Sequence, residues 1–165
     1  MTMWSSDVWE GWEPSGRAER DWLGAPRRQL ARSLLTERSR GTVVAWGRSG
    51  ALGALPDGVP APFKARPAWA LEEADIVWCD HVFGRIGGVE LVSALREAMR
   101  PGTLLAVVDV AEAPSDHVRT WLADTLDLSP TNGVRAVLPQ LFTPLATTSM
   151  RQSPGWTSFT FLGRR

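Results

Sequence analysis

The stretch that decides the fold spans residues 74–109 and reads ADIVWCDHVFGRIGGVELVSALREAMRPGTLLAVVD. Its first part, residues 75–79, is a short apolar run typical of a strand that is buried on both faces. Residues 89–99 repeat apolar side chains at helical spacing, and the Arg-Pro-Gly at 100–102 ends that helix. Residues 103–110 carry the strongest strand pattern in the chain. A strand, a helix and a strand in this order predict a parallel α/β unit.

The residues before this unit add a helix and a strand. Residues 26–37 predict a helix that begins at Pro26, since proline suits a first helical turn. Residues 42–46 form a second apolar run, which is followed by three closely spaced glycines. Residues 54–68 hold four prolines, so at most residues 63–65 are expected to be extended.

The residues after the unit change character. Ser115 or Asp116 is placed to cap a helix. Residues 146–152 and 156–162 are rich in β-forming side chains and are separated by Ser-Pro-Gly, which predicts an antiparallel hairpin. The whole chain therefore reads as an α/β fold, with a mostly parallel sheet that ends in an antiparallel pair.

Composition limits the architecture and the chemistry. The chain has 165 residues, of which 44% are hydrophobic, and this fits one globular domain. Its single cysteine, Cys79, excludes an intramolecular disulfide and a multi-cysteine zinc site, and only two histidines are present. The N-terminus lacks the pattern of a signal peptide, and no run approaches a membrane span. We expect a cytoplasmic protein that binds no membrane.

The formal net charge is zero, but the charges are segregated along the chain. Residues 17–48 carry eight Arg against three acids, residues 70–127 carry eleven acids against four Arg, and residues 128–165 carry four Arg and no acid. The two basic segments either gather on one face, suited to an anionic ligand or an acidic partner, or neutralise the acidic middle within the fold. The neutral total argues against a bulk nucleic-acid binder.

The order of these motifs resembles the class I S-adenosylmethionine-dependent methyltransferases. In that family an acidic strand start, matched here by Asp75-Ile76-Val77, is followed by a helix and a Pro-Gly turn into the next strand, matched by Pro101-Gly102. The family also ends in an antiparallel strand pair. The resemblance implies a Rossmann-like sheet of reduced methyltransferase-type topology and covers about 120 residues in order, from Thr42 to Leu162.

The same resemblance implies a cofactor site, from which this sequence departs. The Gly-rich turn of the family corresponds to residues 45–51, AWGRSGA, where only the first glycine is matched. Only 27 residues separate Gly47 from Asp75, too few for the two strand–helix units that carry the acidic ribose clamp of the family. The adenosine side therefore looks incomplete. The family positions assign any cofactor contact to Trp46, Gly47, Gly50 and Asp109.

Two neighbouring residues are the candidates for catalysis. Asp80 and His81 follow the second strand, where family members often place catalytic groups, and a histidine there could remove a proton at neutral pH. In the alternative interpretation, His81 is a loop residue and Asp80 caps a turn. Cys79 lies within the expected buried strand and reads as an inert small apolar residue.

The N-terminal part reads as an addition to the core. Residues 1–40 are expected to form a Trp-rich and helical segment packed on a methyltransferase-like domain of residues 41–165, within one globular unit. The four tryptophans of this segment could close a pocket, contact a partner or cover the sheet, and an uncovered face could instead form a homodimer; they are Trp4, Trp9, Trp12 and Trp22.

Two functions follow from these observations. The first is a degenerate methyltransferase-like domain that lacks S-adenosylmethionine turnover, holds no cofactor and serves as a binding, regulatory or partner subunit, for a second copy or another protein. The second is a small-molecule enzyme of the same fold, a methyltransferase-like transferase or a cyclase that uses S-adenosylmethionine. A small-molecule ligand is compatible with both.

Overall fold

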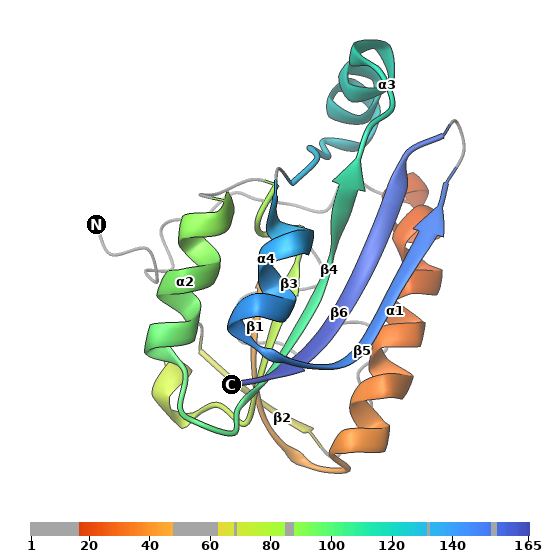
Figure 1. Ribbon diagram of the computed structural model, residues 1–165. Helices are drawn as coiled ribbons and strands as arrows, with labels where there is room; N and C mark the ends of the chain where they lie inside the picture. The colour runs from red at the N-terminus through yellow and green to blue at the C-terminus, as the bar shows by residue number, and fades with distance from the viewer. Residues whose placement is uncertain (1–16, 48–62, 68, 85–87, 132, 153–154) are drawn as a thin grey trace.

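A computed structural model describes six stretches of the chain: residues 17–47, 63–67, 69–84, 88–131, 133–152 and 155–165 (Figure 1). Within them lies one mixed sheet with the strand order β2-β1-β3-β4-β6-β5. The strands are β1 (Gly41–Gly47), β2 (Phe63–Arg66), β3 (Ile76–Asp80), β4 (Leu104–Glu112), β5 (Thr143–Arg151) and β6 (Thr157–Arg164). The pairs β1–β2, β1–β3 and β3–β4 are parallel, whereas β6 is antiparallel to β4 and to β5. The predicted α/β class and the C-terminal hairpin are confirmed.

Helices cover both faces of this sheet. They are α1 (Arg17–Glu37), α2 (Gly88–Ala98), α3 (Asp116–Trp121) with its π-helical continuation η3 (Leu122–Leu126), α4 (Val134–Leu141) and the short 3-10 turn η2 (Leu71–Glu73). Figure 1 shows α1 along one side of the sheet, α2 and α4 on the other, and α3 above the end of β4.

Strand β3 shows why the core has two halves. Ile76 and Trp78 pack toward the α1 side with Leu30, while Val77 and Cys79 pack toward the α2 side with Leu91. All five residues of β3 are buried. A strand covered on both faces needs apolar side chains at every position, which is the pattern that the sequence carries.

Helix α1 differs from the prediction. We expected a helix that begins at Pro26, but α1 begins at Arg17 and contains Pro26 in its interior. Proline inside a helix removes one backbone hydrogen bond and costs about 3 kcal/mol. The burial of Leu30 and Leu34 against the sheet offsets this cost, because tertiary packing contributes most of the stability of a helix.

Helix α4 was missed because Pro139 lies near its end and disguises the pattern. Val134 and Leu138, four residues apart, are both buried and pack on the α2 side of the core. The helix cap at Ser115 is confirmed, since its side chain accepts the N–H of Val118. The tryptophans at positions 4, 9 and 12 lie outside the described residues. None of the helices in the described residues is long and apolar enough to cross a membrane.

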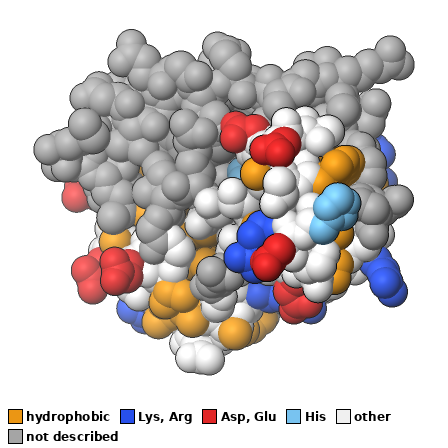
Figure 2. All heavy atoms as spheres, turned by 90° about the horizontal axis from the view of Figure 1, so that it is seen from above, with side chains coloured by type: hydrophobic (Ala, Val, Ile, Leu, Met, Phe, Trp, Pro, Cys, Tyr) orange, Lys and Arg blue, Asp and Glu red, His pale blue; other side chains and the backbone are white. Residues whose placement is uncertain are grey.

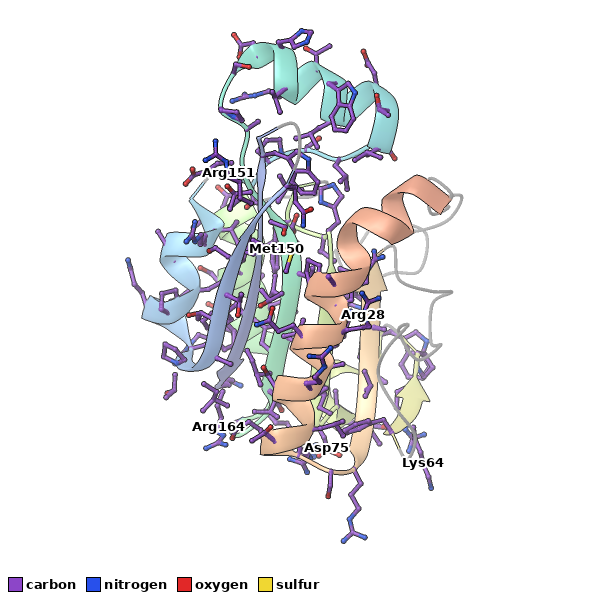
Figure 3. The ribbon with its side chains drawn as sticks, turned by 90° about the vertical axis from the view of Figure 1, so that its right-hand side faces the viewer. Arg28, Lys64, Asp75, Met150, Arg151 and Arg164 are labelled. Atoms are coloured by element: carbon purple, nitrogen blue, oxygen red, sulfur yellow. The ribbon has the colours of Figure 1, made fainter. Side chains whose placement is uncertain are left out.

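The two segments with an excess of arginine lie beside each other, and some of their arginines pair with the acidic middle of the chain. Helix α1 lies beside the C-terminal hairpin, where Gln29 donates to the hydroxyl of Thr148 at 3.1 Å, so the two basic segments are neighbours. Figure 3 shows the labelled Arg28, Arg151 and Arg164 from this side. Other arginines of the same segments pair with the acidic middle, through Arg27–Asp80, Arg38–Asp75 and Arg135–Glu112. Figure 2 shows acidic side chains on the upper surface, and the exposed acids of the α3 region are Glu112, Asp116, Asp124 and Asp127.

Candidate functional site

The parallel strands bring the predicted site residues to one edge of the sheet. Gly47 at the end of β1 stands opposite Asp80 at the end of β3, and Asp80 stands opposite Val108 of β4. Asp109 follows at once. This edge, at the upper end of the sheet in Figure 1, is where ligands bind in open α/β sheets. We call it the carboxyl-end edge.

The carboxylate of Asp80 forms an ion pair with Arg27 of α1. Its two oxygens accept from Nε and Nη2 of Arg27 at 2.6 Å and 2.8 Å, in a bidentate pair. The Asp80 side chain is 0% exposed and the Arg27 side chain is 5% exposed. A bidentate and buried pair of this kind is charge-assisted and geometrically rigid. Asp80 therefore anchors α1 to β3, and its oxygens have a partner from the chain itself.

His81 is held on both ring nitrogens. Its Nδ1 lies 2.7 Å from Oδ1 of Asp109, and its Nε2 accepts the backbone N–H of Ser129 at 3.2 Å. Because Nε2 is an acceptor here, the ring proton belongs on Nδ1, which donates to Asp109. A general base needs a lone pair directed at substrate, and the Nε2 lone pair is directed at Ser129.

Asp109 is equally occupied. Its Oδ1 also accepts the N–H of Val110 at 2.9 Å, and its Oδ2 accepts the N–H of Phe83 at 3.1 Å. Its side chain is fully buried. The carboxylate thus organises the turn after β3, in which His81 adopts a positive φ of 51°.

Gly47 has a φ of +100°, and a Cβ built on it would clash with the backbone carbonyl oxygen of Asp80. The space that a missing side chain leaves at this turn is therefore filled by the chain itself, whereas a cofactor site would leave it to the ligand. Trp46 is buried in the core on the α2 side of the sheet, and Gly50 lies outside the described residues.

Cys79 lies directly before Asp80 and is fully buried. Burial raises the pKa of its thiol well above the usual range, and the carboxylates of Asp109 and Asp80 raise it further. A thiol that stays protonated is a poor nucleophile, which agrees with the expectation of an inert residue.

Among the described residues, no strand end on the adenosine side carries the carboxylate that the family resemblance implies. Strand β2 reads Phe-Lys-Ala-Arg and ends at Arg66, so a basic residue stands where the resemblance implies an acid. Between β2 and β3 the described residues contain no further strand, and Glu72 and Glu73 lie exposed in η2. These described residues do not fit S-adenosylmethionine, because the carboxylates of Asp80 and Asp109 bind the chain's own donors and the Asp80 carbonyl occupies the space beside Gly47. Those described residues also contain no His, Cys, Asp and Glu cluster able to hold a metal ion.

The sequence singles out Asp80, His81 and Asp109 but not the groups that they contact. Nothing in the local sequence marks Arg27 among the arginines of its segment, since its partner is 53 residues away. The backbone N–H of Ser129 carries no sequence signal at all. A buried basic residue opposite an acid is visible only when the helix has been placed on the sheet.

Comparisons with known proteins give the fold its context. No family model matches the chain, and no curated protein matches it in sequence. The N-methyltransferase NodS from Bradyrhizobium japonicum WM9 has a similar structure, with a TM-score of 0.58 and 12% identity over 90% of this chain and 99% of that chain. The mitomycin 7-O-methyltransferase MmcR matches with a TM-score of 0.39 and 20% identity, over 85% of this chain and 40% of its own.

A structure of LepI in complex with SAM matches 97% of this chain, with a TM-score of 0.45 and 9% identity. This chain spans 46% of LepI. The similarity to NodS carries the argument, together with the observed strand order and the antiparallel C-terminal pair. The chain has the fold of the class I S-adenosylmethionine-dependent methyltransferases.

Proposed function

We propose that this protein is a degenerate methyltransferase-like domain that does not turn over S-adenosylmethionine. It acts by binding a protein partner, which is either a different protein or a second copy of this chain. The observation that carries the proposal is the closure of the carboxyl-end edge. Asp80 binds Arg27, and Asp109 binds His81 and two backbone N–H groups. Groups that ligand binding and proton transfer would require are used to hold the fold together.

The cost of opening this edge supports the proposal further. A ligand that took the Asp80 carboxylate would leave the Arg27 guanidinium buried beside it, and breaking one partner out of a buried pair costs about 3–5 kcal/mol. A ligand that took His81 Nε2 would leave the Ser129 N–H without that acceptor, at about 1–3 kcal/mol. Part of the binding free energy of a ligand would therefore be needed to offset the loss of these internal contacts.

Thermal unfolding with S-adenosylmethionine and S-adenosylhomocysteine tests the proposal. A ligand at 1 mM that binds with a Kd of about 10 μM adds roughly 2.7 kcal/mol, which raises the Tm of a chain of this size by about 5–10 °C. We expect a shift below about 1 °C for this protein. LepI, which has been solved in complex with SAM, serves as the positive control when it is measured in parallel. Micromolar binding of either compound by isothermal titration would overturn the proposal and favour the alternative of a small-molecule enzyme.

Sedimentation analysis distinguishes the two kinds of partner. A mass of twice 18.1 kDa that appears over the range of about 1–100 μM protein supports a second copy as the partner. A constant mass of one chain contradicts self-association and leaves a different protein as the partner.

A further inference from the structure

Residues of α4, β5 and β6 line a groove. Figure 1 shows α4 in front of the sheet. It encloses about 320 Å³, near the lower end of the range for small-molecule sites. The side chains that matter here are Arg135 and Pro139 of α4, Thr147 and Ser149 of β5, and Phe159 and Phe161 of β6. We call it the α4–β5 groove.

Strand register builds the floor of the groove. Thr147 stands opposite Phe161, and Ser149 stands opposite Phe159. Directly opposite residues share a face of the sheet, so each pair places one hydroxyl beside one phenyl ring. Thr148 and Thr160, an opposite pair, also line the groove, and the Thr148 hydroxyl accepts from Gln29 of α1. The groove therefore combines hydroxyl groups of both strands with two phenyl rings that are each 2% exposed.

Arg135 supplies the charge. Among the described residues it pairs with the carboxylate of Glu112, at 4.0 Å, and the Glu112 side chain is 75% exposed. An exposed pair at this distance holds the guanidinium weakly. The described residues that line the groove include no carboxylate. The planar fork of an arginine matches a carboxylate in a bidentate manner.

We propose that the α4–β5 groove binds a small aromatic carboxylate. The carboxylate pairs with Arg135, the ring packs on Pro139 and on the base formed by Phe159 and Phe161, and the hydroxyls of Thr147 and Ser149 bond polar atoms at the rim. The groove lies on a face of the sheet and shares no residue with the carboxyl-end edge. This inference goes beyond the proposed function, and each fails independently of the other.

Titration with trans-cinnamate, followed by ¹⁵N chemical shifts, tests the proposal. We expect saturable shifts of the Thr147 and Ser149 amides with cinnamate. The neutral trans-cinnamamide is expected to bind at least roughly tenfold more weakly, because it lacks the charge-assisted pair. Inorganic phosphate, which lacks the ring, is expected to give no saturation below 10 mM. Equal affinity for the acid and the amide, or saturation by phosphate alone, contradicts the proposed ligand class.

Two arginine substitutions provide matched controls. Arg135→Gln is expected to weaken cinnamate binding roughly tenfold and to leave cinnamamide binding unchanged. Arg119→Gln removes the same charge from an exposed position on α3 and is expected to leave both unchanged. Both positions are at the surface, so the Tm of each variant should match that of the parent within about 1 °C. No saturable binding of cinnamate by the parent protein up to 10 mM, or unchanged binding by Arg135→Gln, overturns the proposal.

Discussion

The carboxyl-end edge and the α4–β5 groove are built from the same sheet, but they use polar side chains in opposite ways. At the edge, Asp80 and Asp109 are fully buried and bind donors of the chain itself. In the groove, Thr147 and Ser149 are exposed, and Arg135 lies 4.0 Å from the exposed carboxylate of Glu112. Buried polar groups stabilise a fold only when all of them are bonded, and exposed ones leave that capacity for a ligand. Among the described residues, the polar groups of the carboxyl-end edge thus bind one another, whereas those of the α4–β5 groove are exposed.

The largest expected effect on stability comes from removing Arg27, the buried arginine of the carboxyl-end edge. Arg27→Met leaves the Asp80 carboxylate buried without its bidentate partner, and we expect the free energy of unfolding to fall by about 3–5 kcal/mol in urea titrations. Arg38→Met breaks the partly exposed pair with Asp75 and should cost less than about 1 kcal/mol.

A double variant separates an unpaired charge from lost packing. Arg27→Met with Asp80→Leu removes both charges and should recover more than half of the loss. If Arg27→Met is as stable as the parent protein, the Arg27–Asp80 pair does not stabilise the carboxyl-end edge.

Asp109 gives the next largest effect. Asp109→Ala deprives the N–H groups of Phe83 and Val110 and the His81 ring of their acceptor, so we expect a loss of about 3 kcal/mol. Thr147→Ala removes an exposed hydroxyl from the groove and should change stability by less than about 0.5 kcal/mol. Comparable losses at the two sites, measured by denaturant unfolding, would remove the contrast between the regions.

Gly47 tests whether the edge is filled. Gly47→Ala places a methyl group against the Asp80 carbonyl at a positive φ, and we expect a loss of about 2–3 kcal/mol. Gly88→Ala also has a positive φ, 48°, but its Cβ would meet nothing within 4 Å, so it should cost about 1 kcal/mol. If both variants unfold at the same denaturant concentration, the close approach at Gly47 has no energetic consequence.

The smallest predicted effect concerns pH. Burial raises the pKa of Cys79 in the folded chain, whereas the unfolded thiol ionises near pH 8.5. The stability associated with the protonated thiol is complete below that pH and is lost as the pH rises above it, by about 1–2 kcal/mol between pH 8 and pH 10. The chain has no tyrosine and a single lysine, so few other side chains titrate in this window.

Cys79→Ala should remove that dependence when unfolding is measured at both pH values. A parent protein whose stability is constant from pH 8 to pH 10 would mean that the thiol ionises equally in both states. Slow reaction of the native thiol with a disulfide reagent at pH 8, and fast reaction in urea, would report the same burial by an independent method.

Much of the sheet was predictable because its signals are local. The apolar run of β3 and the Pro-Gly turn before β4 lie within a few residues of one another, and periodicity reports burial directly. The predicted start of α1 was wrong, and α4 was not predicted. A proline inside each helix opposed the helical pattern, and long-range packing outweighed it. Propensity is a preference of about 1–3 kcal/mol per residue at most, and a buried leucine contributes a comparable amount.

The sequence by itself determined the α/β class, the resemblance to the methyltransferase fold and the positions of Asp80, His81 and Asp109 at strand ends. Only the tertiary structure decided what these residues bind. Arg27, the partner of Asp80, lies 53 residues away from it, and Ser129, whose N–H contacts His81, lies 48 residues away from that ring, while the groove joins a helix to strands through register and packing. Hydrogen bonds and ion pairs act over about 3 Å, so their partners are set by the approach of whole elements and not by neighbours in the chain.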